Sequence, residues 1–94
     1  MKKNKTYHVQ HILVKHNYEA DDILRQIKDG KSFEQLAQKY SICSSAKNNG
    51  DLGPIPEGKA DSEFEEAALN LKPNSTSTQP IRTRFGYHII KRIN

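Results

Sequence analysis

The chain has 94 residues, enough for one domain with a modest core but too few for separate cofactor-binding and substrate-binding domains. Hydrophobic residues make up 34% of it and charged residues 28%, which is typical of a globular protein with a thin core and a well-solvated surface. The single cysteine, Cys43, excludes an internal disulfide and a multi-cysteine zinc site. We therefore expect stability to come from packing, with no metal and no cofactor.

Charge and hydropathy also restrict the partners. Fifteen basic and eleven acidic residues give a net charge of +4, but the basic residues are spread from Lys2 to Arg92. Nucleic-acid modules usually concentrate them on one element, so we expect no specific nucleic acid. No apolar run approaches the ~20 residues of a membrane helix, and none follows the basic start as it would in a signal peptide. We expect a cytoplasmic monomer that binds no membrane, and an excised domain of an exported protein is also compatible with the sequence.

The chain begins with residues 1–5, which predict a flexible basic tail before a domain of residues 6–94. From Thr6 to Lys15 apolar side chains occupy both sets of alternating positions, which predicts a central strand with two buried faces. Three helices are predicted next by apolar residues spaced i, i+3, i+4 and i+7. The three sets are Ala20, Ile23, Leu24 and Ile27; Phe33, Leu36, Ala37 and Tyr40; and Phe64, Ala67, Ala68 and Leu71. Ser32 with Gln35, and Ser62 with Glu65, predict capping boxes for the last two helices.

Glycine and proline punctuate the rest of the chain. Between the second and third helices they bracket Leu52 to Ile55, which we predict to be an edge strand. Near the end, Gln79 to Thr83 and Tyr87 to Ile93 flank Arg84-Phe85-Gly86 and predict a hairpin. The predicted order is β, α, α, β, α, β, β. The fold class is α+β, with a four-stranded, mostly antiparallel sheet surrounded by three to four helices.

Histidine is the first candidate for chemistry. His8 and His11 are three apart on a strand and point to opposite faces, so they cannot ligate one metal together. His11 and His88 each lie in an otherwise apolar strand. They are interpreted as buried imidazoles that satisfy each other or a hydroxyl such as Thr83, since unpaired buried groups are unfavourable. Whether this pair also serves a site is left open by the pattern.

Cys43 lies on a loop beside serines, in Ser41-Ile42-Cys43-Ser44-Ser45. The favoured interpretation is a small inert residue. Nucleophilic Cys–His catalysis is the alternative, and it requires the fold to bring His11 or His88 to the thiol.

Four ordered blocks of residues carry a resemblance to a known family. The blocks are His11-Ile12-Leu13-Val14-Lys15, Tyr40-Ser41-Ile42-Cys43-Ser44-Ser45-Ala46-Lys47, Gly50-Asp51-Leu52-Gly53 and Phe85-Gly86-Tyr87-His88-Ile89-Ile90-Lys91. Together they resemble the parvulin family of peptidyl-prolyl cis/trans isomerases over about Tyr7 to Ile93. The resemblance implies a parvulin/FKBP-like fold and catalysis of rotation about the bond that precedes proline.

The resemblance also implies roles for particular residues. His11 and His88 match the paired histidines behind the active site, Thr83 their hydroxyl partner and Cys43 the catalytic loop. Leu52 and Phe64 match the apolar wall that receives proline, and Phe85 lies at its edge. Ala60 stands where many relatives have methionine, which implies a wider or shallower pocket. The implied partners are proline-containing unfolded or flexible protein segments.

Two further expectations follow from the resemblance. The phosphorylation-directed branch of the family carries a basic loop after the first strand, whereas here Lys15-His16-Asn17-Tyr18 has no arginine, so we expect no phosphorylation requirement. Asp61 and Glu63 predict tolerance of, or preference for, basic or neutral residues before proline. The leading hypothesis is a general folding helper. The alternative is a noncatalytic proline-peptide-binding or chaperone-like domain whose pocket is weakened at Ala60.

Overall fold

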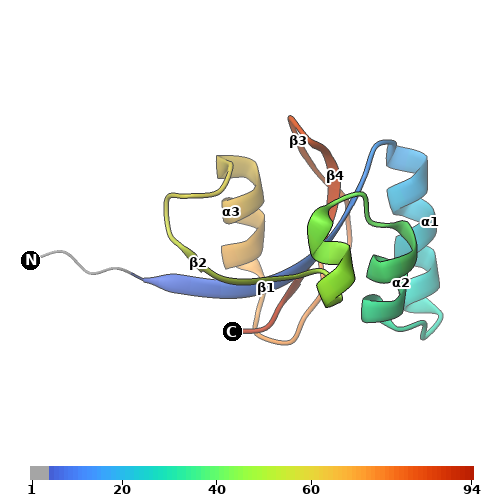
Figure 1. The fold of residues 1–94 in the computed structure, drawn as a ribbon, viewed down its shortest axis with the longest axis horizontal. Helices are drawn as coiled ribbons and strands as arrows, with labels where there is room; N and C mark the ends of the chain where they lie inside the picture. The colour runs from blue at the N-terminus through green and yellow to red at the C-terminus, as the bar shows by residue number, and fades with distance from the viewer. Residues whose placement is uncertain (1–4) are drawn as a thin grey trace, which may run out of the picture.

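The computed structural model describes residues 5–94 and shows a mixed α and β fold (Figure 1). Its elements are β1 (Thr6–Val14), α1 (Asn17–Lys28), α2 (Phe33–Tyr40), the 3₁₀ helix η1 (Ser44–Asn48), β2 (Asp51–Pro56), α3 (Ser62–Asn70), β3 (Ile81–Thr83) and β4 (Gly86–Arg92). The predicted order of strands and α-helices is confirmed, and η1 is an addition that the sequence reading missed. Most of the predicted tail, residues 1–4, lies outside the described residues.

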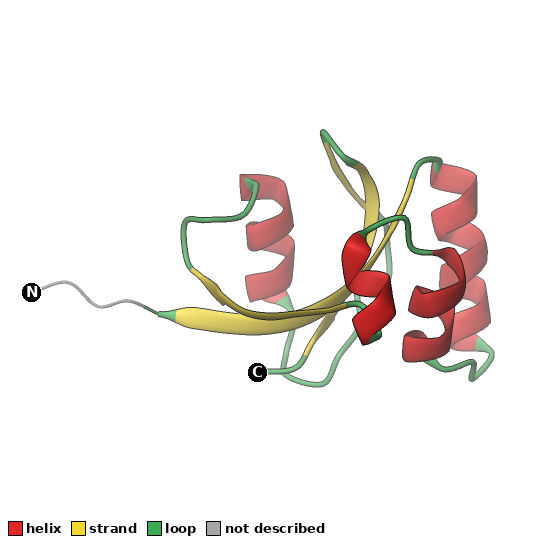
Figure 2. Ribbon diagram, in the orientation of Figure 1, coloured by secondary structure: helices red, strands yellow, loops and turns green. Residues whose placement is uncertain are grey.

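The four strands form one sheet in the order β2-β1-β4-β3, and every neighbouring pair is antiparallel (Figure 2). The α+β class is therefore confirmed, with β1 central and β2 at an edge as predicted. β1 and β4 pair from Val9 opposite Arg92 to Val14 opposite Tyr87. A short turn joins β3 to β4, as the glycine after Phe85 predicted.

Helices cover both faces of the sheet, with α1 and α2 on one side and α3 on the other (Figure 1). Alternate residues of a strand point to opposite faces, so β1 and β4 contribute to two cores. Ile12, Val14 and Ile89 pack with the buried residues of α1 and α2. The second core, beside α3, contains Tyr7, Val9, Phe64, Ala68 and Ile90. The two-sided apolar pattern of β1 thus has a direct structural explanation.

Neither predicted capping box forms in full: α2 has half of its box, and α3 has none of it. Ser32 caps α2, because its hydroxyl oxygen accepts a hydrogen bond from the Gln35 amide at 3.2 Å. The predicted capping box of Ser62 and Glu65 is wrong, since Asp61 is the N-cap of α3 and Ser62 is already helical. The Glu65 carboxylate instead accepts hydrogen bonds from the Tyr7 hydroxyl and the Gly58 amide. The Glu65 carboxylate, which the capping box would have used locally, is therefore bonded to a tyrosine 58 residues away in sequence.

Gly50 generates a stability prediction. It has a φ of +81°, and a Cβ placed on it would lie 2.5 Å from the His11 carbonyl oxygen. We expect Gly50→Ala to lower the free energy of unfolding by about 3 kcal/mol, because the strained backbone and the clash act together. Gly30→Ala is the control, since Gly30 has a φ of +97° but no atom near its missing Cβ. Urea denaturation of both variants measures the difference, and equal losses would contradict the role of the clash.

Candidate active site

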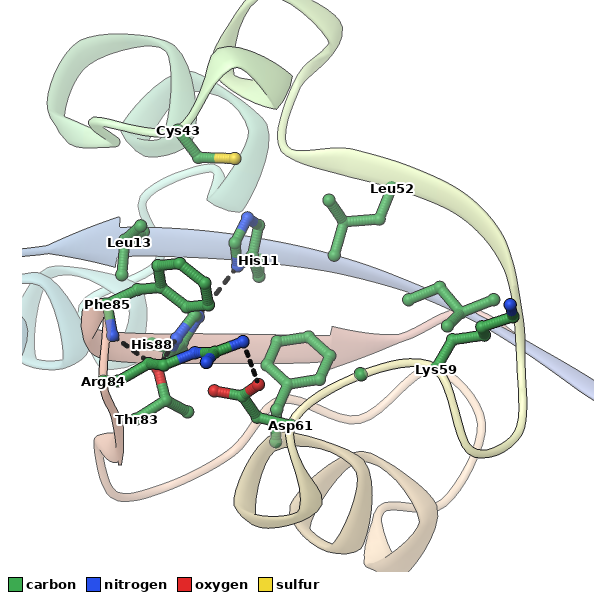
Figure 3. A pocket seen from close by; sticks show the side chains of 13 residues that line it. His11, Leu13, Cys43, Leu52, Lys59, Asp61, Thr83, Arg84, Phe85 and His88 are labelled. Atoms are coloured by element: carbon green, nitrogen blue, oxygen red, sulfur yellow. Dashed lines mark hydrogen bonds and ion pairs between the residues drawn. The ribbon is translucent and has the colours of Figure 1, made fainter.

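A pocket of about 370 Å³ opens on the α3 side of the sheet, between α3, the loop that precedes it and the β3–β4 turn (Figure 3). All eight residues proposed from the sequence line it: His11, Cys43, Leu52, Ala60, Phe64, Thr83, Phe85 and His88. Five further residues complete the lining: Leu13, Ile55, Lys59 and Arg84, which were missed, and Asp61, which was expected to act on the substrate but was not proposed as a pocket residue. The structure therefore gathers the candidate residues at one place, while their functional roles stay predictions.

The floor of the pocket is a hydrogen-bonded pair of histidines. His11 on β1 and His88 on β4 are both buried, and their Nδ1 atoms lie 3.0 Å apart. The other ring nitrogen of His88 lies 2.7 Å from the Thr83 hydroxyl oxygen, which also accepts a hydrogen bond from the Phe85 amide. Strand pairing thus places one imidazole against the other and fixes His88 on both sides.

Burial keeps both imidazoles neutral at pH 7. Burial lowers the pKa of His11 to about 4, and the neighbouring His88 lowers it further in the same direction. Burial likewise lowers the pKa of His88 to about 4, although the Asp61 carboxylate acts against this shift. A neutral pair can share only one proton between the two Nδ1 atoms, so one ring donates and the other accepts.

One ring nitrogen of the pair is left without a protein partner. Nε2 of His11 is buried and makes no hydrogen bond with any residue of the part of the chain that the structure describes. In Figure 3 this nitrogen faces the side of the pocket where the Cys43 side chain lies. Its protonation depends on the pair, because a ring that donates through Nδ1 leaves Nε2 as an acceptor. The pocket floor can therefore present either a donor or an acceptor without acquiring charge.

The wall of the pocket is apolar. Phe64, on α3, is only 5% exposed and packs edge-on against both histidines, with ring centroids 5.8 Å from His11 and 5.1 Å from His88. Leu52 comes from β2, and Ala60 from the loop before α3. Phe85, in the β3–β4 turn, is 58% exposed at the mouth. An apolar wall of this kind, solvated at the mouth of the pocket and buried at its floor, suits a small apolar group.

The rim of the pocket carries charges of both signs. The Asp61 carboxylate lies 3.5 Å from the Arg84 guanidinium, which also stacks over the Phe85 ring at 5.0 Å. Lys59 lines the pocket as well, whereas Glu63 does not. The negative charge expected at the entrance of the pocket is thus offset by two cations. Arg84 lies far from Asp61 in sequence, and Lys59 belongs to no periodic pattern. The basis for a preference for basic residues before proline is weaker than the sequence suggested.

The remaining candidates have simple placements. His8 does not line the pocket and instead pairs with Asp51, its Nε2 lying 2.6 Å from the carboxylate. Cys43 is half-buried, immediately before η1, and contributes one wall. Across residues 5–94, no three His, Cys, Asp or Glu side chains are grouped so that they could hold a metal ion. In the same range, no helix has the length and apolar character needed to cross a membrane.

Comparison with known proteins identifies the family to which this fold belongs. A family described as "Rotamase: PPIC-type PPIASE domain" matches residues 11–94. This chain belongs to the parvulin family. The parvulin domain is 42% identical over 90 residues to foldase protein PrsA 1 of Lactobacillus johnsonii, covering 90% of this chain and 30% of that protein.

Two solved structures extend the comparison. The crystal structure of PrsA from Bacillus subtilis superposes with a TM-score of 0.90 at 41% identity, over 95% of this chain and 35% of that one. The solution structure of NmPin, the parvulin of Nitrosopumilus maritimus, superposes with a TM-score of 0.82 at 42% identity, over the whole of both chains. The parvulin domain therefore spans about a third of the PrsA proteins and the full length of NmPin.

The neutral histidines generate a prediction of pH dependence. Unfolded histidine titrates near 6.5, whereas His11 and His88 titrate near 4 in the folded domain. The stability that these two neutral rings give the folded domain is complete above about pH 6.5. It is lost as the pH falls toward 4, because in that range only the unfolded chain binds protons at these rings. We expect a loss of up to about 1 kcal/mol per pH unit for each ring, measured by urea denaturation between about pH 7.5 and 5.

Two variants isolate this effect from the titration of other groups. His88→Asn should flatten the fall in stability between neutral and mildly acid pH. His16→Ala, at an exposed position before α1, should leave the slope of the parent domain unchanged. If His88→Asn keeps the full slope, the buried pair does not govern the acid sensitivity.

Proposed function

We propose that this parvulin domain accelerates rotation about Xaa-Pro bonds in unfolded or flexible segments of other proteins, without requiring phosphorylation. The observation that carries the proposal is the apolar pocket built on the neutral pair of His11 and His88. Membership of the peptidyl-prolyl isomerase family supports it. The name foldase, carried by the PrsA relatives, supports a general role in protein folding.

The reaction needs no bond to be broken. Rotation about the peptide bond is opposed by amide resonance, with a barrier of about 18–20 kcal/mol. The twisted transition state has lost this resonance and the charge separation that accompanies it. A site that binds the twisted form better than either planar isomer lowers the barrier. We assign gripping of the proline ring to Leu52, Phe64 and Phe85, with Ala60 forming the shallow part of the wall.

The floor contributes shape and a neutral hydrogen-bonding surface. His11, His88 and Thr83 hold one another in place, so no charge faces the apolar proline ring. We assign a noncovalent role to Cys43, which lines the same pocket. A polar network of this kind is stable in an apolar environment because nearly all of its groups are paired. Nε2 of His11 is the one ring nitrogen of the network that lacks a partner among the described residues.

Phosphate independence is supported by the loop between β1 and α1. In the structure that connection is only Lys15 and His16, and it contains no arginine. A doubly charged phosphate is recognised in proteins by clustered cations, most often arginine. The rim cations Lys59 and Arg84 come from other loops, and Arg84 already pairs with Asp61. We further propose that the domain acts as a monomer in the cytoplasm and needs no cofactor.

A noncatalytic binding domain is the second candidate, and Ala60 is the observation that favours it. This short side chain leaves one part of the wall shallow, so a proline ring can enter without being gripped firmly. Binding both planar isomers and the twisted form equally would give affinity without acceleration.

The isomerase proposal predicts catalysis of exchange in short unphosphorylated Xaa-Pro peptides, measured by NMR exchange spectroscopy. The domain should accelerate cis/trans exchange at catalytic concentration. Phe85→Ala should reduce the acceleration by about tenfold through lost contact area, with little effect on thermal stability because Phe85 is 58% exposed. Tyr18→Ala, at a side chain 70% exposed and outside the pocket, is the matched control and should change neither quantity.

The same experiment separates the two candidate functions. If peptide resonances shift on titration but exchange is not accelerated, the noncatalytic binder is correct. Phe64→Ala is less informative for this purpose, since Phe64 belongs to the second core and its truncation should lower stability as well as binding.

Substrate preference generates a separate prediction. Peptides with Ala, Leu, Lys, Glu or phosphoserine before proline should differ in kcat/KM by no more than about fivefold, because exposed rim charges act weakly in water. Preference for phosphoserine above about tenfold would contradict phosphate independence. If such a preference is measured, Arg84→Gln tests whether Arg84 at the rim causes it, since the preference should then disappear in that variant.

A further inference from the structure

The Glu65 carboxylate joins three segments of the chain beside the pocket. One oxygen accepts a hydrogen bond from the Tyr7 hydroxyl on β1 at 3.0 Å. Both oxygens accept a hydrogen bond from the amide of Gly58, which lies in the loop between β2 and α3, at 2.9 and 3.1 Å. Glu65 itself follows Phe64 on α3. A sheet strand, a helix and a loop are therefore held together by one side chain.

We infer that Tyr7 and Glu65 are positioning residues that hold the loop of residues 57–61 at the distance from the sheet that the proline pocket needs. The inference rests on the proposed isomerase function. Neither residue lines the pocket, whereas three residues of the loop do: Lys59, Ala60 and Asp61. Tyr7 and Glu65, which we call the clamp, therefore act on substrate through the loop and not by contact.

The loop depends on this clamp because its other anchors lie at its two ends. At the far end, the Asp61 carboxylate pairs with the exposed Arg84 guanidinium at 3.5 Å, and the Asp61 carbonyl accepts a hydrogen bond from the Glu65 amide at 2.9 Å. Two backbone hydrogen bonds hold its start: the Glu57 amide donates to the Lys5 carbonyl at 2.9 Å, and the Lys59 amide to the Pro56 carbonyl at 3.2 Å. Glu57, Gly58 and Lys59 are exposed, and Ala60 offers only a methyl group to the core. A loop with little buried apolar surface opens easily unless polar contacts restrain it.

The chemistry of the clamp suits a fixed contact. Burial, and then the hydrogen bond to Glu65, raise the pKa of Tyr7 far above its ordinary value, so the phenol stays protonated and donates. Its ring is 2% exposed and belongs to the second core, which fixes the hydroxyl position. Hydrogen bonds to a charged acceptor are stronger than those between neutral groups. The loop is thus anchored to a buried side chain of β1.

Tyr7→Phe and Glu65→Ala test the inference in the whole chain. Tyr7→Phe removes only the hydroxyl and leaves the ring packed. We expect each variant to raise the KM for a Xaa-Pro peptide by about fivefold to tenfold, with kcat changed less than about twofold, because the loop shapes the binding wall and not the floor. Amide hydrogen exchange at residues 58–61 should accelerate in both variants. Glu65→Gln keeps one acceptor oxygen and should give an intermediate KM.

Matched controls distinguish positioning from general destabilisation. Glu66→Ala makes the same charge change at an exposed position on the same helix, and Tyr40→Phe removes a hydroxyl on the other face of the sheet. Both should keep the parent KM. A lower unfolding midpoint with unchanged KM and unchanged exchange at 58–61 would overturn the inference.

The design also separates this inference from the proposed function. If the parent domain does not accelerate exchange, the isomerase proposal fails. The clamp is then read from the peptide Kd by NMR titration. A Kd that rises with Tyr7→Phe and Glu65→Ala supports the clamp, and a Kd that does not change overturns it.

Discussion

The antiparallel pairing of β1 with β4 is the constraint on which the rest of the structure depends. Leu13 lies opposite His88, and His11 lies opposite Ile90, so both imidazoles project toward α3. A shift of β4 by one residue would turn His88 to the other face, away from His11 and among the apolar side chains under α1 and α2. Gly86 helps to fix the register, because a Cβ there would lie 2.5 Å from the Val14 carbonyl oxygen. The site is therefore specified by the same hydrogen bonds that form the sheet.

One face of the sheet serves both stability and function. Phe64 packs against Tyr7 and Val9 in the second core and also presents its ring edge to the histidine pair. Burial in this environment is what lowers the histidine pKa values and keeps the pocket floor neutral. The hydroxyl of Thr83 is the polar contact that makes burial of His88 tolerable. Stability and chemistry are consequently hard to separate by mutation at the floor, and easier to separate at the exposed Phe85.

The sequence predicted most of this fold because its strongest signals are local. Periodic apolar spacing located α1, α2 and α3, and the two-sided pattern of Thr6 to Lys15 located the central strand. The 3₁₀ helix η1 was missed because Ser44–Asn48 has no apolar periodicity. Glu65 was misread because a capping box is inferred from residues three apart, whereas Tyr7 is 58 residues away. Lys59 and Arg84 were missed for a related reason: sequence carries no direct record of which surface charges converge on a pocket.

The two halves of the pocket differ in how firmly they are held, and this difference bears on function. The floor belongs to paired strands in the middle of the sheet, where His11 and His88 fix each other. The opposite wall includes Ala60, on a loop that is held by the bond from Gly58 to Glu65 and by the pairing of Asp61 with the exposed Arg84. A rigid floor cannot by itself discriminate planar from twisted peptide, because the grip on the proline ring requires both walls. Under the proposed function, the loop side therefore decides whether a domain with this floor catalyses rotation or only binds proline. A small side chain at position 60 makes the position of that loop more important, since less of the wall is supplied by the residue itself.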